Sequence, residues 1–273
     1  MNPSSGELRM LDARTGSAVE VRPARPGLLR VCAHARPESE KSGLNGVRVL
    51  LLADLLARSA ELIGIQVFTA VVFPCAVPAE LTCAERAASE LGIHPPAVRT
   101  GVGADGALPA GWADVRIIDD AASPKVSGGE IVTRAGSVRW RGSADGDRLP
   151  EMTPFTRDAA AVRLALMSAP YGDAVDLNDV DFVSACETVT RWRRLVGLWA
   201  ESPSKPIPEG IARQIGSAFR DLDMVPVLAL LRDLASDEAI APGAKFETIV
   251  FADRVLGLDL AREIGQPHSG SES

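Results

Sequence analysis

The densest group of side chains that could do chemistry follows a short apolar strand that ends in Cys32. The polar residues of the segment after this strand are His34, Arg36, Glu38, Lys41, Asn45 and Arg48. An imidazole can act as a general base, and a guanidinium can bind a carboxylate or a phosphate through two parallel hydrogen bonds. We therefore take His34 as the candidate catalytic base. The candidate substrate-binding residues are Cys32, Arg36, Asn45 and Arg48, and the alternative to a binding site is a solvated loop.

Three other segments carry residue types that occur in functional sites. Asp119 follows the apolar run 115–118, so it is a substrate-binding candidate at a pocket rim, although a strand-end turn explains it equally well. The basic cluster 191–194, with Trp199 nearby, could meet an acidic partner or form a solvated helix face. The glycines of segment 101–106 have the spacing of a dinucleotide-binding loop. No clear strand precedes them and no helix start follows, so we interpret this segment as a flexible loop.

The cysteine pattern does not indicate a metal centre. The four cysteines are scattered and contain no Cys-x-x-Cys pair: Cys32, Cys75, Cys83 and Cys186. A zinc site needs three or four protein ligands in tetrahedral array. In a reducing compartment such cysteines are most simply buried thiols. We expect no metal from this pattern.

The elements that position these residues form a β-α-β unit. Residues 28–32 end a series of short strands, residues 47–63 have helical spacing of apolar residues, and residues 65–73 form a β-branched run. Gly64 is a natural end for the helix between the strands. This succession predicts a parallel sheet, with His34 at its carboxyl edge, where α/β folds bind ligands.

The next part of the chain is less regular, and the last part is helical. We expect a helix over 80–91, a buried strand over 115–118 and a hairpin of two strands over 131–141, turning at residues 135 and 136. Helical periodicity returns beyond residue 156, in five segments: 157–169, 177–201, 207–220, 224–235 and 244–264. The predicted domains are an α/β domain over 1–155, a helical bundle over 156–265 and a disordered tail over 266–273.

The composition excludes several classes of protein. Apolar residues make up 46% of the 273 residues, so a sizeable core can form, and the net charge of −7 argues against a general nucleic-acid binder. The longest apolar run, 63–79, is interrupted by Gly64, Gln66, Pro74 and Pro78, too often to span a bilayer. The first residues have neither a basic start nor an apolar core, unlike a signal peptide. We expect a soluble cytoplasmic protein with no membrane partner.

Four patches of the sequence resemble cysteinyl-tRNA synthetase and the mycothiol cysteine ligase. They read LLRVC at 28–32, RVLLLAD at 48–54 with LIGIQV at 62–67, DAAAVRLALMSAPY at 158–171, and AFRDLD at 218–223 with DRVLGL at 253–258. The resemblance implies an α/β fold: a Rossmann-like class I synthetase catalytic domain with a reduced insertion, followed by an all-helical bundle. Residues 74–129 would be the remnant of that insertion. Cys32 aligns with a zinc ligand that in the family also grips the substrate thiolate.

The departures from the family concern its ATP-binding signatures. The first, His-Ile-Gly-His or His-Ile-Gly-Asn, corresponds to residues 43–46, which read GLNG and contain no histidine. The second, Lys-Met-Ser-Lys-Ser, would lie between the predicted hairpin and Asp158, where residues 144–148 read ADGDR. A superficially similar segment, 125–129, precedes the hairpin, and we interpret it as a surface loop. Because these groups stabilise charge on pyrophosphate, ATP is disfavoured as a cofactor. No segment resembles the anticodon-binding tail, so we do not expect tRNA charging.

Three hypotheses of function follow. The first is a repurposed synthetase relative that binds or transfers an amino-acid-derived or nucleotide-like small molecule, with aminoacyl ligase or transferase-like chemistry if it is an enzyme. The second is a non-catalytic pseudo-synthetase that binds a protein partner or forms a homo-oligomer through the bundle face around Trp192, Trp199, Phe219 and Phe251. The third is a residual cysteine ligase, which requires both ATP and a metal.

Overall fold

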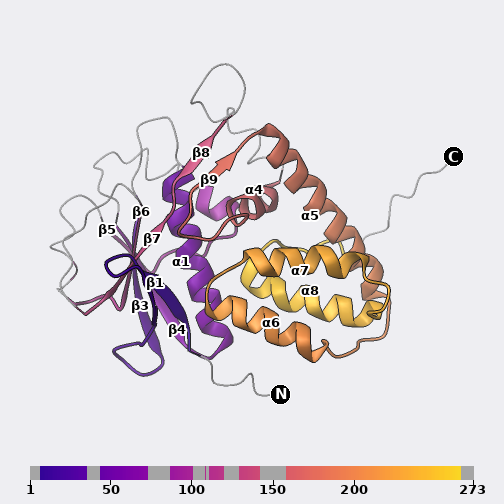
Figure 1. The fold of residues 1–273 in the computed structure, drawn as a ribbon, viewed down its shortest axis with the longest axis horizontal. Helices are drawn as coiled ribbons and strands as arrows, with labels where there is room; N and C mark the ends of the chain where they lie inside the picture. Colours follow the sequence, from indigo (N-terminus) through magenta and orange to yellow (C-terminus); the bar gives the residue numbers. More distant parts are fainter. Residues whose placement is uncertain are drawn as a thin grey trace.

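A computed structural model describes residues 7–35, 44–72, 87–100, 108, 111–119, 129–141 and 158–265. It combines a parallel β-sheet with a helical bundle, and the long helix α1 (Leu44–Leu62) lies between them (Figure 1). The expectations for Arg36, Glu38, Lys41, the segment 144–148 and the tail 266–273 lie outside the described residues.

The central sheet is parallel throughout, as the β-α-β unit predicts. Its five strands have the spatial order β5-β4-β3-β6-β7. They are β3 (Leu28–His34), β4 (Gln66–Val72), β5 (Val98–Thr100), β6 (Val115–Asp119) and β7 (Ile131–Ala135). From the central pair β3 and β6, the strands that follow in the chain are added outward on both sides, β4 and β5 beside β3 and β7 beside β6. In open α/β sheets ligands bind at such a switch point, beyond the carboxyl ends of the strands.

Helix α1 connects β3 to β4 and is buried around most of its circumference. It contacts the sheet on one side and α8 (Pro242–Leu256) on the other. A helix with neighbours on both sides is apolar all round, which explains the unbroken run from Val49 to Ala53. The helix ends where predicted, since Gly64 has a φ of +83°, a conformation that glycine adopts without steric cost.

The two strands expected over 131–141 exist, but the predicted hairpin is wrong. β8 (Val138–Trp140) turns away from β7 and pairs in parallel with β9 (Val175–Leu177), a short strand that the sequence analysis missed. The cause lies at Gly136, whose N–H donates to the carbonyl of Tyr171 over 2.8 Å. A Cβ at Gly136 would lie 2.1 Å from the carbonyl oxygen of Asp173, so glycine allows the 171–173 backbone to pass here.

The five predicted helices of the bundle are confirmed. They are α4 (Ala159–Leu166), α5 (Asp179–Ala200), α6 (Glu209–Arg220), α7 (Val225–Ser236) and α8. Two begin with side-chain caps: Asp158 accepts from the N–H of Ala160 in α4, and Asn178 with Asp181 forms a capping box on α5. One hydrophobic core cluster contains residues of the sheet, of α1 and of the bundle.

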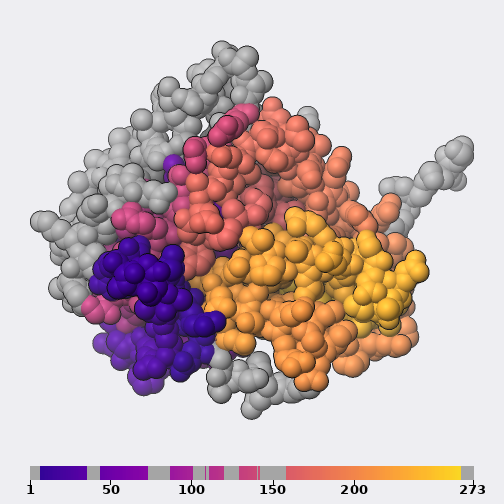
Figure 2. Space-filling view, in the orientation of Figure 1, coloured from indigo at the N-terminus to yellow at the C-terminus, as the bar shows by residue number. Residues whose placement is uncertain are grey.

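The two N-terminal strands contact both the sheet, at β7, and the bundle, after α6. β1 (Arg9–Asp12) and β2 (Ser17–Glu20) form an antiparallel hairpin. Figure 2 shows the hairpin, in indigo, against the orange helices, and Arg9 forms an ion pair of 2.7 Å with Asp221, directly after α6. Residues 74–129 supply β5 and β6 to the central sheet. Among the described residues, no helix has both the length and the apolar character that crossing a membrane requires.

Candidate active site on one face of β3 and β6

Cys32 and His34 lie on the same face of β3, two residues apart, close to the switch point of the sheet. Both are buried, and Cys32 Sγ lies 3.5 Å from His34 Nε2. Arg116 is the cross-strand partner of Cys32 on β6, so its side chain stands on that face too. Its Nη1 lies 2.5 Å from His34 Nε2 and 3.7 Å from Cys32 Sγ. The sheet register thus brings a thiol, an imidazole and a guanidinium into one cluster.

Glu130 directly precedes β7, so it lies at the amino end of that strand, and it completes the cluster on this face of the sheet. Its Oε1 accepts from Nε of Arg116 over 3.2 Å, and its side chain is fully buried. Within the described part of the chain, no donor reaches the other carboxylate oxygen, Oε2. A buried carboxylate oxygen without a donor is costly, so a ligand that brings an N–H or O–H group to this point would be stabilised there.

The geometry defines the chemical state of the cluster. A guanidinium can only donate, so Nε2 of His34 is the accepting nitrogen and the ring proton is on Nδ1. A thiol within reach of an imidazole is the arrangement of a nucleophile and its base. Nε2 of His34 can accept the thiol proton only when an anion draws the Arg116 guanidinium away from it.

The other predicted site residues take different positions. Asp119 is buried at the carboxyl end of β6, and its carbonyl accepts from Arg134 over 3.3 Å. Asn45 lies in the first turn of α1, where its Oδ1 accepts from the N–H of Val138 over 2.6 Å. Arg48 is buried, and donates to the carbonyls of Pro170, Gly136 and Asp173 at distances between 2.5 and 3.0 Å. Asn45 and Arg48 therefore join α1 to β8 and to the turn before β9, and ligand binding by them stays a prediction.

The sequence analysis missed Arg116 and Glu130. A signal existed for Arg116, because it is the one charged residue inside the apolar run 115–118. No local signal marks Glu130, whose role depends on which strand lies beside β6. Among the described residues, no group of three or more His, Cys, Asp or Glu side chains is placed to hold a metal. Cys75 and Cys83 lie outside the described residues, and zinc at Cys32 stays a prediction.

A second buried polar network links α1 to the bundle. Asp54 Oδ2 accepts from Arg163 over 2.5 Å and from Arg58 over 2.8 Å, and Asp54 Oδ1 lies 2.8 Å from His94 Nδ1. Arg163 also donates to the carbonyls of Leu91 and Leu256, at 3.1 and 2.5 Å. Burial raises the pKa of Asp54, but the two guanidinium groups outweigh it and the net shift of that pKa is downward. Asp54 is therefore ionised, and the network is structural.

The basic cluster 191–194 is only partly a surface feature, because Arg191 and Arg194 are exposed whereas Trp192 and Arg193 are buried. Arg193 is buried and bonds to Asp158 and to the carbonyls of Leu258 and Asp259. Three of the four aromatic residues of the predicted docking face, Trp192, Trp199 and Phe219, are buried in the core, and Phe251 packs against it. The interpretation of these aromatic side chains as a face for partners is therefore wrong, because the bundle needs them inside.

The comparisons with solved structures agree on one fold. The chain superposes on a putative arginyl-tRNA synthetase from Campylobacter jejuni with a TM-score of 0.53 at 8% identity, over 88% of this chain and 92% of that one. Arginyl-tRNA synthetase from Thermus thermophilus gives 0.53 at 10% identity, over 90% and 83% of the two chains. The enzyme from Plasmodium falciparum gives 0.50 at 7% identity, over 89% and 77%. No family model and no curated protein matches the sequence.

The chain therefore has the fold of a class I aminoacyl-tRNA synthetase, a Rossmann-like parallel sheet with a helical bundle. At these identities the likeness concerns the fold alone.

Proposed function

We propose that this chain binds an amino-acid-derived or nucleotide-like small molecule on the face of the sheet where Cys32 of β3 and Arg116 of β6 lie side by side. The observation that carries the proposal is the buried chain Cys32–His34–Arg116–Glu130 at the switch point of the sheet. Arg116 offers a charge-assisted donor to a carboxylate or a phosphate, and Glu130 Oε2 offers an acceptor to an amine or a hydroxyl. A molecule with both kinds of group, such as an acyl adenylate or an amino acid, complements the pair.

The resemblance of the sequence supports a cysteinyl-tRNA synthetase or mycothiol cysteine ligase ancestor. We propose that ATP-driven activation is lost, because the positions of both ATP signatures lack the expected histidines and lysines. A ligand anion at Arg116 would free Nε2 of His34, which then takes the proton of the Cys32 thiol. The thiolate attacks the carbonyl carbon of an activated acyl group, a thioester forms, and the phosphate leaves with the electrons of the broken bond.

Calorimetry on the full chain tests the binding. We expect heat from a non-hydrolysable aminoacyl-adenylate analogue and none from ATP alone. Arg116→Lys keeps a positive charge opposite Glu130 but loses the forked donor, and should weaken binding by about ten-fold. Arg139→Gln is the matched control, because Arg139 lies on β8 with its side chain 60% exposed and pairs with Asp176. Silence from amino acids, the adenylate analogue and ATP alike would refute the proposal.

Mass spectrometry tests the transfer step separately. After incubation with an acyl adenylate, the intact chain should gain one acyl mass, and Cys32→Ser and His34→Gln should reduce the yield of this thioester. If the adenylate binds but no acyl adduct forms, the acyl-transfer step is refuted and only the binding function remains. Pyrophosphate exchange in the presence of ATP and cysteine would instead support the residual ligase, and we expect none.

The second candidate function, a partner-binding or dimerising module, is favoured by one feature of the bundle. The first turns of α5 expose Val180 and Val183, whose relative exposures are 75% and 54%. Size-exclusion chromatography with light scattering tests the homodimer. A stable dimer that Val180→Asp dissociates would support this candidate, and a monomer at all concentrations would remove it.

A further inference from the structure

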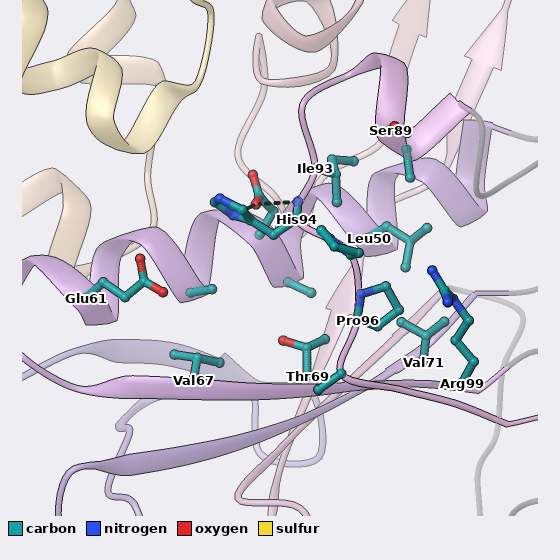
Figure 3. A pocket seen from close by; sticks show the side chains of 16 residues that line it. Leu50, Glu61, Val67, Thr69, Val71, Ser89, Ile93, His94, Pro96 and Arg99 are labelled. Atoms are coloured by element: carbon teal, nitrogen blue, oxygen red, sulfur yellow. Dashed lines mark hydrogen bonds and ion pairs between the residues drawn. The ribbon is translucent and has the colours of Figure 1, made fainter.

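A separate cavity of about 320 Å³ lies between α1, β4 and the segment 88–99 (Figure 3). Its floor includes Val67, Thr69 and Val71 on β4. Cys32 pairs in register with Ala70, so its side chain shares a face with Ala70, opposite to that of Thr69 and Val71. The sheet therefore separates this cavity from the candidate active site. Its volume is in the range of small-molecule sites.

The cavity is long and apolar along its middle. Its α1 wall runs from Leu50 to Glu61, eleven residue steps or about 16 Å of helix. The apolar lining consists of Leu50, Ala53, Ala57, Val67, Val71, Ala88, Ile93, Pro95, Pro96 and Ala97. Four alanines thus stand where larger side chains would fill the space.

The two ends of the cavity have opposite charges. Figure 3 shows the carboxylate of Glu61 at one end, beside Val67, and the guanidinium of Arg99 rising from β5 at the other. Arg99 pairs in register with Val71, four residues along β4 from Val67, so these ends are about 13 Å apart along the strand. Arg99 has five donors, and can bind a carboxylate alongside the contacts that it already makes.

A fixed imidazole lies between the ends. Asp54 accepts from the backbone N–H of His94 at 3.2 Å and holds Nδ1 of its ring at 2.8 Å. Because Asp54 is ionised and itself held by Arg58 and Arg163, it places the ring proton on Nδ1. Nε2 of His94 is then an acceptor, on a side chain that is 60% exposed. A ligand N–H along the cavity wall has a preoriented partner there.

We propose that this cavity binds a short linear peptide with free termini, its amino group at Glu61 and its carboxylate at Arg99. An extended chain spans about 3.3–3.6 Å per residue, so a tripeptide covers about 10 Å, and the long Glu61 and Arg99 side chains close the remaining distance. A single amino acid carries its amine and carboxylate on one carbon and cannot reach both ends. A fatty acid has no group for Glu61.

Calorimetry with Ala-Val-Ala and the full chain tests the site. N-acetylation and C-amidation of the peptide should each weaken binding by about five-fold, as expected for exposed ion pairs. In Glu61→Gln the effect of acetylation should disappear while that of amidation stays, and Arg99→Gln should show the reverse. Glu90→Gln is the control, since Glu90 is exposed on the same segment and does not line the cavity.

A filling variant makes the test independent of charge. Ala57→Phe should abolish peptide binding, while an unchanged circular dichroism spectrum shows that the chain still folds. The adenylate analogue should bind this variant as it binds the unmodified chain, which separates this site from the candidate active site. No binding at millimolar peptide, equal affinity for the blocked and free peptides, or equal affinity for free alanine would each overturn the proposal.

Discussion

Asp54→Asn is the substitution that tests most severely how α1 packs against the helical bundle. Asp54 and Arg163 have fully buried side chains, joined at 2.5 Å, so the variant leaves the Arg163 guanidinium buried without its counter-charge. Breaking a buried ion pair by removing one partner costs about 3–5 kcal/mol. Asparagine keeps only one of the two oxygens, so either His94 at Oδ1 or Arg58 and Arg163 at Oδ2 lose their acceptor. Because the stability of a domain is about 5–15 kcal/mol, this loss is a large share of the total.

Urea denaturation followed by circular dichroism measures the loss. The matched control is Asp176→Asn, whose carboxylate pairs with Arg139 but is 44% exposed, and it should cost less than about 1 kcal/mol. The double variant Asp54→Leu with Arg163→Met removes both charges together, and should cost less than the sum of the two single changes. If Asp54→Asn unfolds within about 1 kcal/mol of the unmodified chain, the buried pair does not hold α1 to the bundle.

Three further predictions concern acid stability and local contacts. The Arg163 and Arg58 guanidiniums lower the pKa of Asp54 in the folded chain. The stability that ionised Asp54 contributes is therefore complete above the pKa of the unfolded chain, near 3.8, and is lost as the pH falls through the lower pKa of the folded chain. In Asp54→Asn the free energy of unfolding should fall less steeply in acid. Gly136→Ala should cost about 1–3 kcal/mol, because its Cβ would overlap the carbonyl oxygen of Asp173, whereas Gly172→Ala, with open space around it, should not destabilise. Asp158→Ala removes the cap of α4 and the acidic partner of Arg193 together, so thermal melting should show a loss of about 2–4 kcal/mol; a change below about 0.5 kcal/mol would refute both contacts.

Local signals account for the parts of the fold that the sequence predicts. Helix α1 and its end at Gly64 follow from apolar spacing and one left-handed glycine, and the bundle helices follow from periodicity and proline breaks. The pairing of β8 with β9 has no such signal. It joins two three-residue strands 37 positions apart, Val138 to Val175, and depends on a close backbone approach at Gly136.

The candidate site divides in the same way. The sequence places Cys32 and His34 at a strand end, because a clear apolar strand leads up to them. Arg116 and Glu130 could not be placed in this way, because their neighbours are set by the order of strands in the sheet. The sequence places Arg48 near the predicted pocket. In the structure its donors contact the backbone carbonyls of Gly136, Pro170 and Asp173, and ligand binding by Arg48 stays a prediction. Buried carbonyls need donors as much as ligands do.

The most direct measurement for the proposed function is a crystal structure of the chain with the non-hydrolysable aminoacyl-adenylate analogue. The account predicts density on the face of β3 and β6 that carries Cys32 and Arg116, with a phosphate-like or carboxylate group on Arg116 and an amine or hydroxyl within hydrogen-bond distance of Glu130 Oε2. Density only elsewhere, or an empty site with Arg116 still bonded to His34 at saturating analogue, would contradict it.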